Sequence, residues 1–218
     1  ITLRNPRQWK VAGKPTPRLD TAVKVNGATK YGIDTAMPGM LYAAITNCPV
    51  FGGKLKSFDA KQASAMPGVK KVLAVDGKGV AVVADNWWRA KTALEAIKIV
   101  WDEGQNKNLS SAGIEAMLKE GLEASEAAVG NQAGDVKAAL ASAHQVIEAD
   151  YSYPYQHHAT MEPMNCTVKI SANRAEAWVP TQNAELAMAS MSETTKIPLA
   201  QCEVYRVDPG GGFGRRVT

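Results

Sequence analysis

The residues best suited to chemistry form a glycine-rich run near the end of the chain, Asp208–Arg216. Four of the five positions 210–214 are glycine, Phe213 interrupts them, and two arginines follow. Glycine lets the backbone take positive φ and approach a ligand closely, and successive amides in such a turn can bind an anion. The run therefore predicts an anion-binding loop, with a flexible glycine linker as the structural alternative.

The loop does not match the motifs of nucleotide-binding proteins. No Gly-Lys-Ser/Thr follows it, as a Walker loop requires, and its spacing differs from the dinucleotide fingerprint G-x-G-x-x-G. We therefore do not expect a nucleotide bound through either motif.

A second candidate is the segment around His158 and Glu162. On a helix these two side chains would share one face, as some metal ligands do. Pro154 and Pro163 bracket the segment, so a helix is not expected. We favour a buried, hydrogen-bonded His and Glu over a metal site, because no further Cys or His stands at ligand spacing.

The three cysteines, Cys48, Cys166 and Cys202, are widely separated. They give neither a disulfide framework nor a CxxC metal motif, and we expect reduced core residues. The serines near candidate bases lack the G-x-S-x-G elbow of serine hydrolases. Taken alone, the residues predict a loop for an anionic cofactor and do not name the reaction.

Length and composition fit a protein of two domains. The chain has 218 residues, 45% of them hydrophobic, and no apolar run approaches the roughly 20 residues that span a bilayer. Much of the net charge of +4 lies in residues 1–19, which we interpret as an extended, solvated basic arm. Nucleic-acid binding is not expected, because the chain as a whole is not strongly basic.

The predicted fold class is α+β, a mixed α/β chain whose first unit covers residues 20–104. The expected order of strand, helix, strand, strand, helix, strand is the split βαβ arrangement, an open sheet with helices on one face. We expect Trp87 and Trp88 to pack in the core or at an interface rather than to form a ligand platform. The strands are expected at 40–46, 71–75, 80–84 and 98–101, and the helices begin at Asp59 and at Asp85 or Asn86.

The second unit is expected over residues 135–218, after a helical linker at 105–134 that is rich in Ala, Ser, Glu, Gly and Asn. A short helix at 135–143 precedes a half-buried strand in which Ile147, Tyr151 and Tyr153 face one side. A hairpin, a helix capped by Asn183 and a strand at 202–207 then lead into the glycine loop.

Three motifs follow one another along the chain: His158–Thr167, Val179–Asn183 and Pro209–Arg216. In this order they resemble the molybdenum-binding subunit of the molybdenum hydroxylases, the xanthine dehydrogenase and aldehyde oxidase family. The Gly-Arg-Arg ending, where xanthine dehydrogenases have Gly-Gly-Lys, is similar to the branch of the isoquinoline 1-oxidoreductase β-subunit and membrane-associated aldehyde dehydrogenases. Residues 18–102 resemble that family's α/β hammerhead domain, and 135–218 resemble the truncated start of its molybdopterin-binding domain.

The resemblance implies a molybdopterin cofactor, commonly the cytosine dinucleotide in this family, which holds molybdenum without a protein ligand. It also implies that Gly212, Phe213 and Gly214 contact the cofactor. The amides of Phe213 and Gly214 would donate hydrogen bonds to the oxygen side of the molybdenum centre. Arg215 follows as an anion contact. Gln156, six residues before the glutamate of the second motif, follows as a contact of the molybdenum centre.

The resemblance also implies hydroxylation of an N-heteroaromatic ring or oxidation of an aldehyde, with oxygen derived from water. Electrons would pass to a small 2Fe–2S iron–sulfur subunit and onward to a cytochrome c. The compartment stays open between the bacterial periplasm, which this branch favours, and the cytoplasm. The family's general base is a glutamate expected beyond Thr218. We therefore expect an N-terminal part of a longer subunit, inactive and without cofactor on its own. The alternative is a non-catalytic binding or interaction module that keeps the hammerhead fold.

Overall fold

The computed structural model describes residues 2–217, and the contacts within it divide the chain into two compact units. Unit 1 joins Ile1–Met37 to His157–Thr218, and unit 2 is Pro38–Gln156. This division differs from the boundaries expected from composition, because the short helix η2 (Gly32–Asp34) lies against Glu162 and Pro180 of the later segment. No helix in the described part of the chain is long and apolar enough to cross a bilayer.

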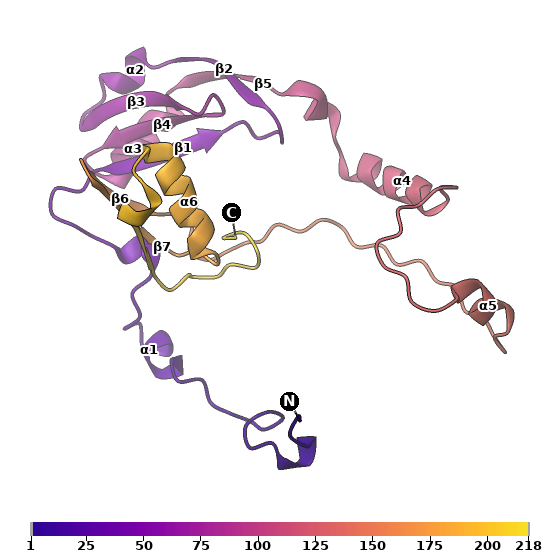
Figure 1. Ribbon diagram of the computed structural model, residues 1–218. Helices are drawn as coiled ribbons and strands as arrows, with labels where there is room; N and C mark the ends of the chain where they lie inside the picture. Colours follow the sequence, from indigo (N-terminus) through magenta and orange to yellow (C-terminus); the bar gives the residue numbers. More distant parts are fainter. Residues whose placement is uncertain (1, 218) are drawn as a thin grey trace. The chain divides into compact units, whose positions relative to one another are not determined.

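Unit 2 contains two small antiparallel sheets (Figure 1). The first has the order β1-β4-β3, formed by β1 (Tyr42–Asn47), β4 (Gly79–Ala84) and β3 (Val69–Val75). In the second, β2 (Lys54–Asp59) pairs with β5 (Lys98–Asp102). The helices α2 (Lys61–Ser64) and α3 (Trp87–Glu95) pack on the strands. The core is formed by Ala63, Val80, Val82, Ala93 and Ile97.

The single open sheet expected for this unit is wrong, because the chain forms two sheets and the additional strand β2. The residues of β2 that pack on the core, Leu55 and Phe58, are three positions apart. A register shift between Leu55 and Ser57 makes this possible, since a β-bulge adds one residue and changes which side chains face inward. A strict period of two therefore does not reveal this strand.

The four predicted strands of residues 20–104 are confirmed as β1, β3, β4 and β5, whereas α2 begins at Lys61, two residues after the expected Asp59. The β3–β4 hairpin turns at Asp76 and Gly77, whose φ angles of 49° and 62° suit a tight turn. Asn86 begins α3, and its side chain accepts a hydrogen bond from the Arg89 amide at 2.9 Å. Trp87 and Trp88 do not pack in the core, because they are 52% and 67% exposed, and their packing at an interface stays a prediction.

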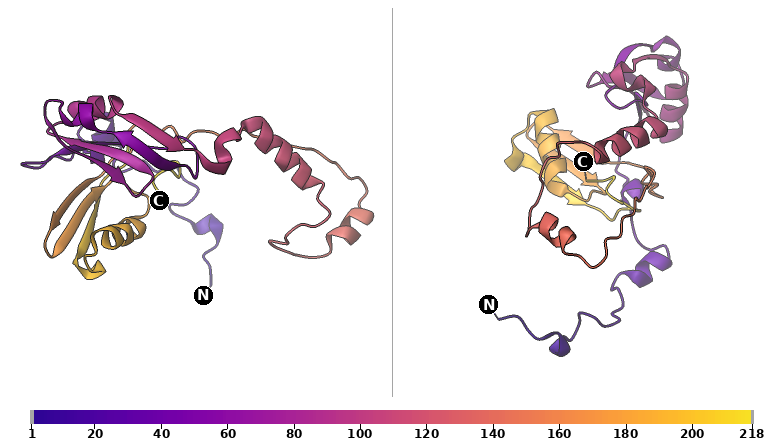
Figure 2. Two further views of the ribbon diagram at one scale, coloured as in Figure 1. Left: turned by 90° about the horizontal axis from the view of Figure 1, so that it is seen from above. Right: turned by 90° about the vertical axis from the view of Figure 1, so that its right-hand side faces the viewer.

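The expected helical linker contains α4 (Ser111–Leu122), which is capped by Ser110 through a 3.1 Å bond from the Gly113 amide. A shorter helix, α5 (Val136–Ala141), follows after irregular chain (Figure 2). The strand expected around Ile147–Tyr153 is wrong: its apolar side chains are more than 80% exposed, and no described strand pairs with it. Alternation marks an apolar face, but a strand also needs a neighbour for its backbone hydrogen bonds.

Unit 1 is a three-stranded sheet, in the order β6-β7-β8, with helix α6 packed against β7 and β8 (Figures 1 and 2). β6 (Thr167–Ser171) and β7 (Arg174–Val179) form the expected hairpin. α6 (Ala184–Thr195) is the crossover between the parallel strands β7 and β8 (Cys202–Arg206). Its core consists of Ala175, Ala177, Met191, Ile197 and Cys202.

Of the three cysteines, Cys202 is buried as expected, whereas Cys48 is half-buried and Cys166 is exposed.

The remaining elements are short. The short elements are η1 (Pro6–Gln8), α1 (Thr21–Val25), η3 (Gly104–Asn108) and η4 (Leu199–Gln201).

Candidate functional site

The glycine loop follows β8 and folds back onto unit 1 as a turn. Gly211 and Gly214 have φ angles of 102° and 97°, which suit glycine. Phe213 also has a positive φ, 54°, a conformation that costs a non-glycine residue on the order of 1 kcal/mol. The loop is therefore held in this shape by its surroundings.

Glu162 is the buried acceptor beneath the loop, with 7% of its surface exposed. Its Oε1 accepts hydrogen bonds from the Ile33 amide at 2.9 Å and from Asn165 Nδ2 at 3.0 Å. Its Oε2 accepts from the Gly210 amide at 2.9 Å and lies 3.0 Å from Nη2 of Arg216. One carboxylate thus joins three separate segments of unit 1, and the prediction of a buried, hydrogen-bonded Glu162 is confirmed.

Arg216 is the cation inside the loop and is 3% exposed. Its Nη2 donates to the carbonyl oxygen of Glu162, and its Nε donates to that of Gly211, both at 2.7 Å. A third nitrogen, Nη1, lies 3.4 Å from the carbonyl oxygen of Pro180. Sequence reasoning missed this residue, because its acid partner is 54 positions away and only the fold brings the two together.

Gln182 holds the loop from the other side. Its Oε1 accepts from the amides of Gly214 at 3.1 Å and Arg216 at 3.3 Å. Its own backbone amide donates to the carbonyl oxygen of Arg216 at 2.9 Å. The Gly214 amide is thus engaged within the protein, in contrast to the expectation that it faces a cofactor.

Three other amides of the loop, those of Gly211, Gly212 and Phe213, donate to no acceptor within residues 2–217. The carbonyl groups of the same peptide units accept from the Glu162 amide, Arg216 Nε and the Arg215 amide. The N–H and C=O of a trans peptide point in opposite directions, so these three N–H groups point away from their internal partners. They are the donors that this loop can offer to an anion.

A cavity of about 680 Å³ borders the loop. Apolar side chains dominate its lining, among them Ile33, Met161 and Phe213, of which Met161 is 92% and Phe213 72% exposed. Lys24 is the cation of the lining, and it pairs with Asp20 at 2.6 Å and with Asp208 at 3.6 Å. The arrangement suits a ligand with a flat apolar part and an anionic group near the amides.

The remaining predicted residues are less constrained. Arg215 is exposed, and its amide closes the turn by donating to the Gly212 carbonyl at 2.8 Å. His158 is exposed rather than buried as expected, and it lies beside Gly214. Gln156 is exposed and belongs to unit 2, so its role stays a prediction.

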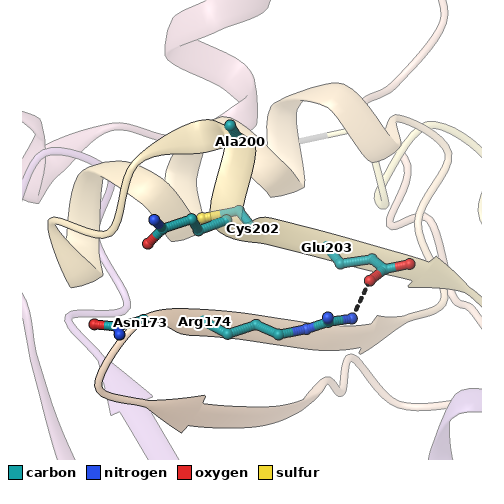
Figure 3. A pocket seen from close by; sticks show the side chains of 6 residues that line it. Asn173, Arg174, Ala200, Cys202 and Glu203 are labelled. Atoms are coloured by element: carbon teal, nitrogen blue, oxygen red, sulfur yellow. Dashed lines mark hydrogen bonds and ion pairs between the residues drawn. The ribbon is translucent and has the colours of Figure 1, made fainter.

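A smaller cavity, of about 270 Å³, lies at the start of β8, and no residue of the glycine loop lines it (Figure 3). Arg174 in its wall pairs with Glu203, and its Nη2 lies 3.3 Å from Oε1 of Glu176. Burial raises the pKa of the Tyr205 hydroxyl, which contacts the same arginine. These charges satisfy one another, and the cavity adds no reacting group to the site.

The pKa of Glu162 predicts how unit 1 responds to acid. Burial by itself raises this pKa, but hydrogen bonds from Gly210, Asn165 and Ile33 and the charge of Arg216 outweigh it, so the pKa lies below the ordinary 4.5. A depressed pKa gives stability that is present above the unfolded value and is lost as pH falls through the folded value. We therefore expect the melting temperature of unit 1 to fall below about pH 4.5.

Thermal unfolding followed by circular dichroism from pH 7 to pH 3 checks this prediction. The Glu162→Gln variant lacks the titrating carboxylate, so its melting temperature should depend less on pH over the acidic part of the range. Identical pH profiles for the two proteins would contradict the assignment.

Comparisons with known proteins agree with this geometry. Residues 121–218 match the molybdopterin cofactor-binding domain. The chain is 29% identical to the isoquinoline 1-oxidoreductase subunit beta of Brevundimonas diminuta, over 100% of this chain and 29% of that protein. It is 25% identical to the molybdenum-binding subunit of an Escherichia coli aldehyde oxidoreductase, over 96% of this chain and 32% of that protein.

A solved structure shares the fold. Quinoline 2-oxidoreductase from Pseudomonas putida 86 superposes with a TM-score of 0.67 at 21% identity, over 94% of this chain and 31% of that one. The chain thus spans about a third or less of the length of these relatives. Residues 121–218 are thus similar to the molybdopterin cofactor-binding domain, and the chain as a whole is similar to the N-terminal part of molybdenum hydroxylase large subunits.

Proposed function

We propose that the chain is part of the catalytic subunit of a molybdenum hydroxylase, which hydroxylates an N-heteroaromatic ring or oxidises an aldehyde with oxygen from water. One observation carries the proposal: the three outward amides at Gly211–Phe213 lie inside the match to the molybdopterin cofactor-binding domain. The two substrate classes correspond to relatives named for isoquinoline and aldehyde oxidation.

The residues of the loop fit a molybdopterin. Its anionic oxygens would accept from the amides of Gly211, Gly212 and Phe213, which are fixed donors and need no reorganisation. The exposed side chains of Phe213 and Met161 would shield a bound substrate from water on the cavity side. No group of three His, Cys, Asp or Glu in the described chain is placed to hold a metal, so the pterin would carry it.

When bound, the molybdenum cofactor supplies the two-electron redox chemistry, and this chain's residues bind and orient it. We propose the cytosine dinucleotide form, with Arg215 and Gln156 as additional contacts. Unit 2 is proposed to be the α/β hammerhead domain. We further propose that electrons pass to a 2Fe–2S iron–sulfur subunit and then to a cytochrome c in the periplasm, and that the chain alone is inactive.

Two loop variants test this function in the polypeptide expressed from its whole open reading frame with the neighbouring iron–sulfur subunit. Phe213→Ala removes an apolar wall beside the donors and should lower kcat/KM roughly tenfold with molybdenum content little changed. Gly212→Val should also lower the molybdenum content, because an added Cβ would lie 2.6 Å from Gln182 Oε1 and push this side chain away from the loop amides that it holds. Metal analysis and steady-state kinetics give both quantities.

The matched control is Phe51→Ala, which removes an 83% exposed phenylalanine from unit 2 and should leave both measurements unchanged. Wild-type activity and metal content in both loop variants would place the cofactor elsewhere. Wild-type protein purified without molybdenum would favour the non-catalytic binding module instead.

A further inference from the structure

We propose that Gln182 is a positioning residue, which selects the loop amides that remain available to an anionic ligand. The ligand part of this inference rests on the proposed function, whereas the part about the loop itself does not. Gln182 lies just before α6, outside the glycine run, and reaches the loop only through the fold.

The geometry of the Gln182 side chain supports this role. A single oxygen, Oε1, accepts from the amides of both Gly214 and Arg216, so it fixes two peptide units of the turn at once. The Gln182 backbone amide and the Thr181 hydroxyl both donate to the carbonyl oxygen of Arg216, at 2.9 and 3.1 Å. The segment before α6 therefore holds the far end of the loop.

Gly212 leaves no room for a side chain beside Gln182. A Cβ atom there would lie 2.6 Å from Oε1 and 2.8 Å from Cδ of Gln182, which is closer than real Cβ contacts allow. The glycine at 212 and the glutamine at 182 are thus complementary, and a larger residue at 212 would push the glutamine away from both amides.

The loop amides are consequently divided into two groups. Those of Gly214 and Arg216 donate to Gln182 Oε1, whereas those of Gly211, Gly212 and Phe213 have no acceptor within residues 2–217 and remain for a ligand. Without the Gln182 acceptor, the turn at 213–216 would lose the hydrogen bonds that keep the Gly214 amide on the inner side. The outer amides would then no longer be pre-organised donors.

Three variants of the polypeptide from the whole open reading frame, purified with its iron–sulfur subunit, test the inference. Gln182→Met keeps the length of the side chain and removes the acceptor. Gln182→Glu keeps the acceptor and adds a negative charge beside the loop. Gln62→Met, at an exposed glutamine of α2 in unit 2, is the matched control. Hydrogen exchange of the 209–217 amides and molybdenum content are measured for each.

In Gln182→Met, the Gly214 and Arg216 amides should exchange roughly three- to tenfold faster, as expected for losing one hydrogen bond each, and the molybdenum content should fall. Gln182→Glu should restore slow exchange but still hold less molybdenum, because its charge repels an anionic ligand. A purely structural role would let the glutamate variant recover both measurements.

Wild-type exchange in Gln182→Met would overturn the positioning role, as would full molybdenum content in that variant. Wild-type protein without molybdenum would overturn the proposed function. In that case, fast exchange in the methionine variant with recovery in the glutamate variant would still establish that Gln182 sets the shape of the loop.

Discussion

Replacing Glu162 with alanine is expected to lower the free energy of unfolding of unit 1 by about 3–5 kcal/mol. The substitution leaves Arg216, 3% exposed, as a buried cation without its acid. It also removes the acceptor of the Gly210 and Ile33 amides, and buried donors without partners are costly. Because whole domains are stable by only about 5–15 kcal/mol, the variant should lose a large part of the stability of unit 1.

Chemical denaturation followed by tryptophan fluorescence measures this loss. Trp178 lies in β7 and stacks on Tyr205, so its emission reports on unit 1. The matched control is Glu203→Ala, which breaks the ion pair with Arg174, where both side chains are about half exposed. Such a surface pair should contribute less than about 1 kcal/mol. Equal losses of unfolding free energy in the two variants would show that the buried Glu162–Arg216 pair stabilises unit 1 no more than the surface pair does.

Replacing Gly210 with alanine is expected to destabilise unit 1 by about 1–3 kcal/mol, the usual cost of overpacking, and to reduce the bound molybdenum of the complete subunit. An added Cβ would overlap Cβ of Glu162 and lie 3.3 Å from the Glu162 backbone nitrogen. Neither atom is the end of a flexible side chain, so the loop itself must move. The movement would also break the 2.9 Å bond from the Gly210 amide to the carboxylate.

Gly130→Ala is the control for this prediction. Gly130 lies in the exposed linker, and an added Cβ there meets no atom within 4 Å. Thermal unfolding and metal analysis of the two variants should therefore separate the close approach in the loop from a general effect of losing a glycine. A Gly210→Ala protein as stable and as rich in molybdenum as the Gly130→Ala protein would contradict the prediction.

Local signals predicted the elements that depend on neighbouring residues. Asn86 and Asn183 each cap a helix through a side-chain bond to an amide three positions on, so their helices could be located from the sequence. The turn at Asp76 and Gly77 was equally local. The strand β2 was missed because its bulge breaks the alternation, and the exposed chain around Ile147 alternates without a partner strand.

The candidate site shows the same limit. The glycine run by itself determined that a loop of positive φ and close approach lies at residues 210–214. The order of the three motifs along the chain indicated the resemblance to the molybdenum hydroxylases. What only the tertiary structure decided is which groups hold the loop: Glu162, Gln182 and Arg216 meet across 34 to 54 positions.

The physical reason is that backbone propensity acts between near neighbours, whereas burial and hydrogen bonding act between whichever groups the fold brings into contact. A glycine allows positive φ and a close approach of the backbone, and this property could be predicted from the sequence. Which amides turn inward and which stay available depends on acceptors supplied by distant segments. The sequence by itself therefore determined the presence of the loop, and the packing of unit 1 decided the direction of its donors.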